Sequence, residues 1–209
     1  MTETPQSTQE LDPEQQAALV NLIIRGMIRG SVDEATTKLV EQGLAITKGV
    51  VTMPTPQGRS AASEMLRLVP GSEQEKEVDR LFDTFLPINR RLRDICSAWQ
   101  MKPHGNPNDH TDAGYDASVT ERLDEVNQEI EPVLNGFASV EPRLGNYYPE
   151  LQDALGKFKQ GEHTWLASPL IDSYHTVWMH LHQELIMMLG ITRAEDEARE
   201  ERLVSGRAE

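Results

Sequence analysis

The chain has little of several things on which common folds and activities depend. It contains a single cysteine, Cys96, which excludes an intramolecular disulfide and is typical of a protein from a reducing cytoplasm. No apolar run of about 18 residues occurs, which excludes a transmembrane helix. The polar N-terminus lacks the basic and apolar regions of a signal peptide. We therefore expect a cytoplasmic protein that does not enter a membrane.

Recognisable enzyme signatures are missing as well. No glycine cluster precedes a Lys-Ser or Lys-Thr pair, so a phosphate-binding loop is excluded, and no nucleophile elbow occurs. Cys96 lies in an apolar helical stripe, which indicates a buried packing cysteine rather than a nucleophile. We expect a protein that is not an enzyme and that needs no cofactor, with a bound divalent metal as the open alternative.

Positive charge is scarce. The chain has 20 Lys and Arg against 34 Asp and Glu, which gives a net charge of −14. Residues 11–68 contain six basic and six acidic residues, whereas residues 69–209 contain 14 basic and 26 acidic residues. A neutral first part followed by a strongly acidic second part is a poor electrostatic footprint for a protein that binds nucleic acid mainly through phosphates.

The most informative stretch runs from Ser31 to Met65 and begins as a short helix. Ser31 is a suitable N-cap, and Glu34 follows it at the spacing of a capping box. The apolar residues after it share one helical face. Gly43 falls where the end of a helix favours a left-handed residue, so we expect the helix to stop there.

A β-hairpin is predicted next. Residues 44–47 and 50–53 are apolar or β-branched and flank Lys48-Gly49, a plausible two-residue turn. The sequence Thr55-Pro56-Gln57-Gly58-Arg59 then starts another helix. The predicted order is helix, hairpin, helix.

Two signatures in this stretch resemble those of MarR- and PadR-type winged helix-turn-helix regulators over about residues 13–68. The run Leu39-Val40-Glu41-Gln42-Gly43-Leu44 matches the end of that family's recognition helix, and Thr55–Arg59 matches the segment after the wing. The resemblance implies a DNA-binding transcription regulator, and a homodimer, because such proteins bind two half-sites about one helical turn apart. The implied DNA contacts are Thr36, Thr37 and Lys38 in the major groove, Lys48 and Gly49 at the wing tip, and Arg25, Arg29 and Arg59 on phosphates.

The predicted fold class is mainly α, with a winged helix-turn-helix followed by an all-α bundle. Residues 1–12 are polar and are expected to be a disordered tail. The winged-helix domain spans 13–69 and opens with a helix over Pro13–Arg29. The Pro70-Gly71-Ser72 turn separates it from the bundle at 73–192, and 193–209 form a charged tail, expected as a helical extension that frays.

Apolar residues at helical spacing define the bundle. They recur across residues 78–99 and 119–137, where Pro87 and Pro132 should kink the helices without ending them. Ser168 and Pro169 have the pattern of an N-cap and a first helical residue for a last helix over Ser168–Leu189. We expect the bundle to dimerise and to be the part that senses an effector, if there is one.

Two clusters of histidines and carboxylates could bind a divalent metal, for which both are ligands. One lies in the loop before the second bundle helix, with His104, Asp109, His110, Asp112 and Asp116. The other lies in the last predicted helix and contains Asp172, His175 and His182. His110, from the loop, could complete a metal site with them. The alternative is a solvated loop and semi-buried core histidines. The candidate ligands are Asp172, His175, His182 and His110.

Two functions therefore stand open from the sequence. In the first, the chain is a dimeric MarR/PadR-like regulator that binds DNA through its winged helix. In the second, the winged helix does not bind DNA, and the chain is an adaptor whose acidic helical half docks on a protein partner such as an enzyme. The neutral charge of residues 11–68 and the net charge of −14 favour the second.

Overall fold

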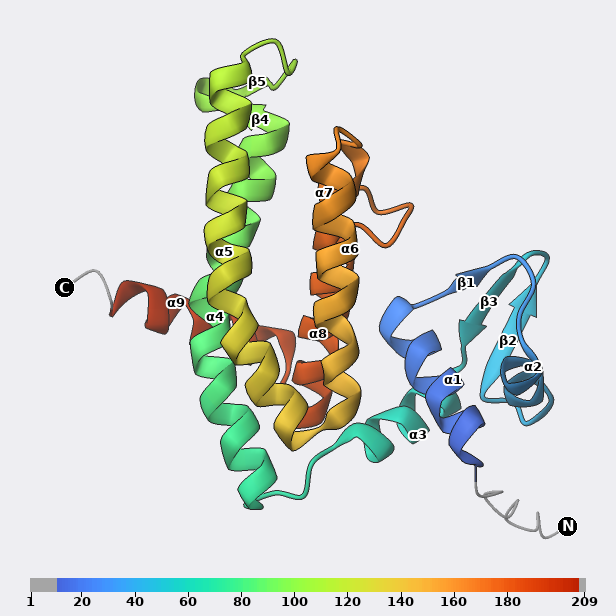
Figure 1. The fold of residues 1–209 in the computed structure, drawn as a ribbon. Coiled ribbons are helices and arrows are strands. Elements are labelled where there is room, and N and C mark those ends of the chain that lie inside the picture. The colour runs from blue at the N-terminus through green and yellow to red at the C-terminus, as the bar shows by residue number, and fades with distance from the viewer. Residues whose placement is uncertain (1–10, 207–209) are drawn as a thin grey trace, which may run out of the picture. The chain divides into compact units, whose positions relative to one another are not determined.

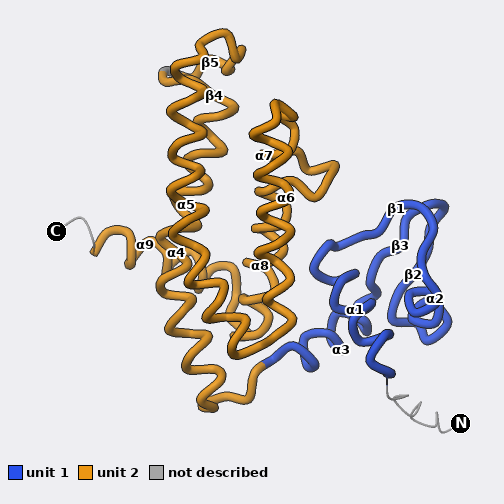
Figure 2. The backbone as a smooth tube through the Cα atoms, viewed as in Figure 1, with its two compact units in different colours: residues 1–67 blue, residues 68–209 orange. Residues whose placement is uncertain are grey.

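A computed structural model describes residues 11–206, apart from the side chain of His104. The chain is mainly helical, which confirms the predicted fold class at that level (Figure 1). It divides into two compact units, residues 1–67 (unit 1) and residues 68–209 (unit 2), as Figure 2 shows. Most of the predicted N-terminal tail lies outside the described residues, and Asp12 at its end caps the first helix. No helix in the described part of the chain has the length and apolar character needed to cross a membrane.

Unit 1 combines helices with a small antiparallel sheet. The strand order in the sheet is β1-β3-β2. The elements are α1 (Pro13–Arg25), β1 (Ile28–Arg29), α2 (Glu34–Glu41), β2 (Ala45–Lys48), β3 (Val51–Pro54) and α3 (Pro56–Leu66).

Helix α1 is shorter than predicted. Gly26 adopts φ +74° and ends the helix, so the prediction of a helix through Arg29 is wrong. Ile28 and Arg29 instead form β1 and pair with β3. Residues 26–33, which include a strand, therefore separate α1 from α2, in place of the three- or four-residue turn of a tight helix-turn-helix.

Helix α2 begins at a different cap from the one expected. Asp33, rather than Ser31, is the N-cap, and its carboxylate accepts a hydrogen bond from the backbone N–H of Thr36 at 2.7 Å. Hydrogen bonding to Thr36 lowers the pKa of Asp33, because it stabilises the ionised form. The negative charge of Asp33 thus sits at the positive end of the helix dipole.

The two sequence signatures of unit 1 meet in space, and this explains their residues. Gly43 ends α2 with φ +76°, as predicted. Thr55 caps α3: its Oγ1 accepts from the N–H of Gly58 at 3.1 Å and donates to the carbonyl oxygen of Gly43 at 2.7 Å. Gly58 lies so close to Leu44 that a Cβ would come within 2.0 Å of the Leu44 carbonyl oxygen. Position 58 therefore accepts only glycine.

The β2–β3 hairpin is displaced by one residue from the prediction. Lys48 pairs with Val51, so Gly49-Val50 is the two-residue turn and Lys48 ends β2. Gly49 has φ +63° at the first central position, as a type II′ turn requires. Thr47 then faces Thr52, with their hydroxyl oxygens 2.9 Å apart. The shift moves each cross-strand partner by two residues, so the same side chains share a face as in the predicted hairpin and only their pairing changes.

Unit 2 is a helical assembly built on two long helices. Figure 1 shows α4 and α5 running antiparallel side by side, and α8 packs against both α4 and α6. Helices α4 and α5 continue through Pro87 and Pro132. The elements are α4 (Glu73–Gln100), β4 (Met101–Lys102), η1 (Pro103–Gly105), β5 (Asn106–Pro107), α5 (Ala113–Val140), η2 (Pro142–Asn146), α6 (Tyr147–Lys159), α7 (Thr164–Ala167), α8 (Tyr174–Leu189) and α9 (Arg193–Ser205).

Helix α8 starts later than predicted. Ser173, rather than Ser168, is its N-cap. The carbonyl oxygen of Ser168 instead accepts hydrogen bonds from the hydroxyls of Ser173 at 2.8 Å and Thr176 at 3.1 Å. Asp172 therefore precedes the helix that contains His175, whereas the sequence predicted both residues in one helix.

The predicted charged tail forms α9, which docks on α4 through polar contacts. Arg199 donates to the carboxylates of Asp79 and Asp83, each at 2.6 Å. Glu200 is buried, and one of its oxygens accepts from the side chain of Asn89 at 2.7 Å. The prediction that residues 193–209 fray is therefore wrong for residues 193–205, because ion pairs and hydrogen bonds with α4 hold them.

Cys96 lies in the core of unit 2, as expected. Burial raises the pKa of its thiol to about 12. At pH 8 the reactive thiolate is then about one part in ten thousand. We predict that Cys96 resists a disulfide reagent in the native chain and reacts fully in urea, measured by the absorbance of the released thiol. Rapid reaction in the native chain, at the rate of a free cysteine peptide, would contradict the burial.

Candidate functional site

The sheet of unit 1 has a covered face and an open face. Ala45, Thr52 and Pro54 lie on the covered face and are buried. Alternation along the three strands places the other set of residues on the opposite side. We call this set the outward face; it consists of Arg29, Ile46, Lys48, Val51 and Met53.

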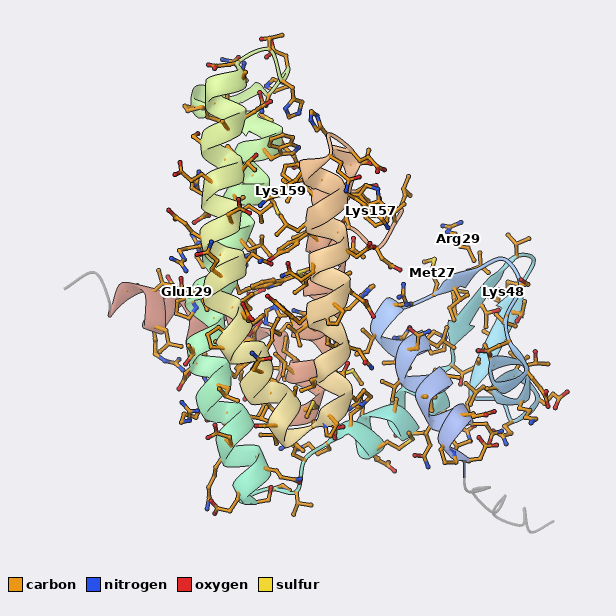
Figure 3. All side chains as sticks on the ribbon, in the orientation of Figure 1. Met27, Arg29, Lys48, Glu129, Lys157 and Lys159 are labelled. Atoms are coloured by element: carbon orange, nitrogen blue, oxygen red, sulfur yellow. The ribbon has the colours of Figure 1, made fainter. Side chains whose placement is uncertain are left out.

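Two cations flank the outward face at one end. Arg29 on β1 and Lys48 on β2 are both in register with Val51 on the central strand. The three side chains therefore stand in a row across the sheet, with the two cations on strands roughly 10 Å apart. Both are exposed, and Figure 3 shows them near the strands of unit 1 together with Met27. No acidic residue occurs in the described strands of this sheet, so the face is positive.

The outward face is also unusually apolar. Ile46 is 42% exposed, and beside the sheet Met27 is 43% and Val50 is 69% exposed. The solvent side of an antiparallel sheet usually carries polar residues. A group of exposed apolar side chains is instead typical of an interaction site. The outward face, with Met27 and Val50, therefore offers an apolar centre with two cations.

Helix α2 does not present the residues expected to read DNA bases. Thr36 is only 2% exposed, so the prediction that it faces the major groove is wrong. Thr37 is exposed, but its hydroxyl donates to the carbonyl oxygen of Asp33 at 2.9 Å. The ammonium of Lys38 lies 2.9 Å from the carboxylate of Glu34, which offsets its charge.

The predicted DNA contacts fall into two groups in the structure. Arg29, Lys48 and Gly49 come together at the hairpin end of the sheet. Arg25 ends α1 and donates from Nε to the side chain of Asn21 at 2.8 Å, and Arg59 is exposed in the first turn of α3. The apolar part of the face was missed from the sequence, because the hairpin was considered only as a wing tip that contacts DNA and β1 was predicted as part of a helix.

The structure does not bring the four predicted metal ligands together. His182 is buried, with Nε2 3.0 Å from the carboxylate of Asp196 on α9. His175 is half-buried, and burial, followed by the charge of a nearby arginine, lowers its pKa. Asp172 is exposed before α8, and His110 lies between β5 and α5. Within residues 11–206, leaving aside the His104 side chain, no three His, Cys, Asp or Glu side chains are placed to hold a metal together.

His110 does have partners of its own, in a second cluster at the end of α4. It contacts Asp116 on α5, and its ring lies 5.4 Å from the ring of His163, centre to centre. Trp99 packs against both rings, at 4.5 Å from His110 and 5.2 Å from His163. Asp116 belonged to the predicted loop cluster, whereas His163 carried no signal in the sequence.

Comparison with known proteins adds no assignment. No family model, curated protein or solved structure matches the chain. The function therefore has to be argued from the two sets of residues described above: the outward face of unit 1 and the histidine cluster of unit 2.

Proposed function

We propose that the chain is a non-enzymatic binding protein whose unit 1 docks a protein partner through the outward face. The observation that carries this proposal is the row Arg29, Val51, Lys48 beside exposed apolar residues on one side of the sheet. Buried apolar anchors supply most of the energy of a protein interface, and charges at its rim supply orientation and partner choice. The partner surface would carry an apolar centre with acidic groups beside it.

This proposal differs in one respect from the adaptor expected from the sequence. There, the acidic helical half makes the contact with a protein partner such as an enzyme. In the structure, several arginines of unit 2 are already paired with its acids: Arg91 with Glu129, Arg93 with Glu200, and Arg199 with Asp79 and Asp83. On unit 1, by contrast, exposed apolar side chains lie beside two cations, Arg29 and Lys48.

DNA binding is the second candidate, and Arg29 and Lys48 favour it, since each could contact a phosphate. Each neutralised phosphate contributes a slope of about −0.9 to the dependence of log affinity on log salt, so two give about −1.8. This corresponds to roughly a tenfold loss of affinity between 50 and 200 mM salt, against 10³–10⁵-fold for proteins that make 6–10 such contacts. A regulator would also need a second copy to occupy two half-sites. The pairing of Lys38 with Glu34 leaves α2 without a free cation.

Charge reversal tests the docking face. We predict that the double variant Arg29→Glu/Lys48→Glu, in the full-length chain, loses at least tenfold in recovery of its partner from source cells. Placing like charges against an acidic partner costs several kcal/mol, and about 1.4 kcal/mol is already tenfold. Recovery is measured by quantitative mass spectrometry of the purified chain and whatever accompanies it.

A matched variant controls for the change in total charge. Lys76→Glu/Arg80→Glu reverses two exposed cations on α4 of unit 2, and each replacement changes the net charge by −2, as in the test variant. It should leave recovery unchanged. Equal loss in both variants, or loss in neither, would rule out the outward face. Tight binding of the native chain to duplex DNA at 200 mM salt, followed by fluorescence anisotropy, would favour the second candidate.

A further inference from the structure

We propose that His110 and His163 together bind one divalent transition-metal ion in unit 2, with Asp116 as the carboxylate that orients His110. This site lies outside the outward face, and it does not depend on the proposed function of unit 1.

His110 is held in a fixed orientation by its loop. It adopts φ +56°, a left-handed conformation that residues other than glycine rarely occupy and that often marks a functional position. Its backbone N–H donates to the side-chain oxygen of Asn108 at 3.2 Å, and Nδ1 lies 3.0 Å from the carboxylate of Asp116. The nitrogen of the Asn108 side chain donates to the other Asp116 oxygen at 2.8 Å and to the carbonyl oxygen of Trp99 at 3.1 Å. Three elements thus converge on one imidazole.

These contacts set which ring nitrogen is free. The side-chain nitrogen of Asn108 lies 3.2 Å from Nδ1 of His110, but its two hydrogens are already donated to Asp116 and to the carbonyl oxygen of Trp99. The 3.0 Å hydrogen bond between Nδ1 and Asp116 therefore uses the Nδ1–H of His110, which the carboxylate accepts. The lone pair is then on Nε2. A histidine that donates one N–H to a carboxylate and keeps the other nitrogen for a metal is the usual arrangement in metal sites.

His163 is placed where a second ligand is needed. The ring centres of His110 and His163 are 5.4 Å apart, with their planes at 52°. Two imidazoles that share an ion at about 2.0–2.1 Å from nitrogen have ring centres roughly 5 Å apart, which is close to the observed separation. His163 is exposed just before α7, and within the described residues its ring makes aromatic contacts and no hydrogen bond.

The donor set selects the class of ion. Neutral imidazoles suit Zn²⁺, Cu²⁺ and Ni²⁺ better than Mg²⁺ or Ca²⁺, which prefer oxygen ligands. Two protein nitrogens, rather than the three or four ligands of a catalytic or structural zinc site, leave the other positions to water. The geometry therefore points to an open, exchangeable site for an ion of the zinc and copper group.

Trp99 provides a local readout for this site, because its ring packs on both histidines. The experiment titrates CuCl₂ or ZnCl₂ into the full-length chain, purified without a histidine tag, and follows binding by calorimetry. Tryptophan fluorescence is recorded for Cu²⁺, which quenches nearby indoles. We expect one ion per chain, and we expect Trp99→Phe to remove most of the Cu²⁺ quenching, because the ring of Trp99 packs on both histidines.

Three variants and one control decide the outcome. His110→Ala and His163→Ala should each weaken binding at least tenfold, and Asp116→Asn should weaken it 10–100-fold through the loss of the orienting carboxylate. His163 is exposed, so its replacement leaves the fold intact and keeps the test valid even if His110→Ala unfolds the loop. His175→Ala, a half-buried histidine elsewhere, should change nothing. Absence of one-to-one binding, or binding unaffected by His163→Ala, would overturn the proposal.

Discussion

Replacing Gly58 with alanine is expected to unfold unit 1 while leaving unit 2 folded. The new Cβ would lie 2.0 Å from the carbonyl oxygen of Leu44, and that oxygen also accepts the N–H of Thr55 at 3.0 Å. The contact is with backbone, so no side-chain rotation relieves it. We expect a cost of about 3 kcal/mol or more, against a total stability of roughly 3–10 kcal/mol for a unit of this size.

Hydrogen exchange measured by mass spectrometry separates the two units. Residues 1–67 contain no Phe, Trp or Tyr, so aromatic fluorescence reports on unit 2 alone. In Gly58→Ala, amides of β2 and β3 should lose protection while those of α4 and α5 keep it. Gln57→Ala places the same residue at the neighbouring exposed position of α3 and should shift stability by less than about 0.5 kcal/mol. Equal protection in the two variants would mean that unit 1 absorbs the clash.

The second large effect is expected at Asn89, which links α4 to two other helices. Its side-chain oxygen accepts the indole N–H of Trp178 at 3.0 Å, and its nitrogen donates to the buried carboxylate of Glu200 at 2.7 Å. Asn89→Leu leaves a buried indole N–H without an acceptor and a buried carboxylate with one donor fewer. Each unsatisfied group costs about 1–3 kcal/mol, so we expect a loss of about 3 kcal/mol in urea unfolding followed by tryptophan fluorescence.

Two further variants show whether the loss comes from this network. Asn135→Leu makes the same change at an exposed position of α5 and should stay within about 0.5 kcal/mol of the native chain. In Asn89→Leu/Glu200→Leu the carboxylate that lacks a donor is removed as well. The double variant should therefore lose less unfolding free energy than the sum of the losses in the two single variants. Strict additivity would show that Asn89 and Glu200 do not act together.

Local sequence signals predicted the parts of the fold that local chemistry decides. Gly43 ends α2 and Thr55 caps α3, as expected, because both outcomes depend on residues within one helical turn. Where two nearby residues could serve, the sequence could not choose between them: Asp33 took the cap expected for Ser31, and Gly26 ended α1 before the predicted end at Arg29. In α1 the choice follows from pairing of β1 with β3, which lies more than twenty residues further along the chain.

Contacts between distant segments account for most of the remaining differences. Residues 193–205 are highly charged and were predicted to fray. Glu200 is nevertheless buried, because Asn89 and two arginines of α4 pair with its carboxylate. The outward face also needs β1, which pairs with the distant β3 and places Arg29 beside Val51. His163 is far from His110 in sequence, so only the fold could show that they are neighbours.

Crosslinking from position 46 tests the proposed docking face most directly. The full-length chain carries a photoreactive phenylalanine in place of Ile46, at the apolar centre of the outward face, or in place of Thr37 on the exposed side of α2. After irradiation in source cells, adducts are identified by mass spectrometry and tested for nuclease and protease sensitivity. We predict a discrete protein adduct from position 46, absent in the Arg29→Glu/Lys48→Glu background, and none from position 37. A nuclease-sensitive adduct from position 37, or no adduct from position 46, would contradict the account.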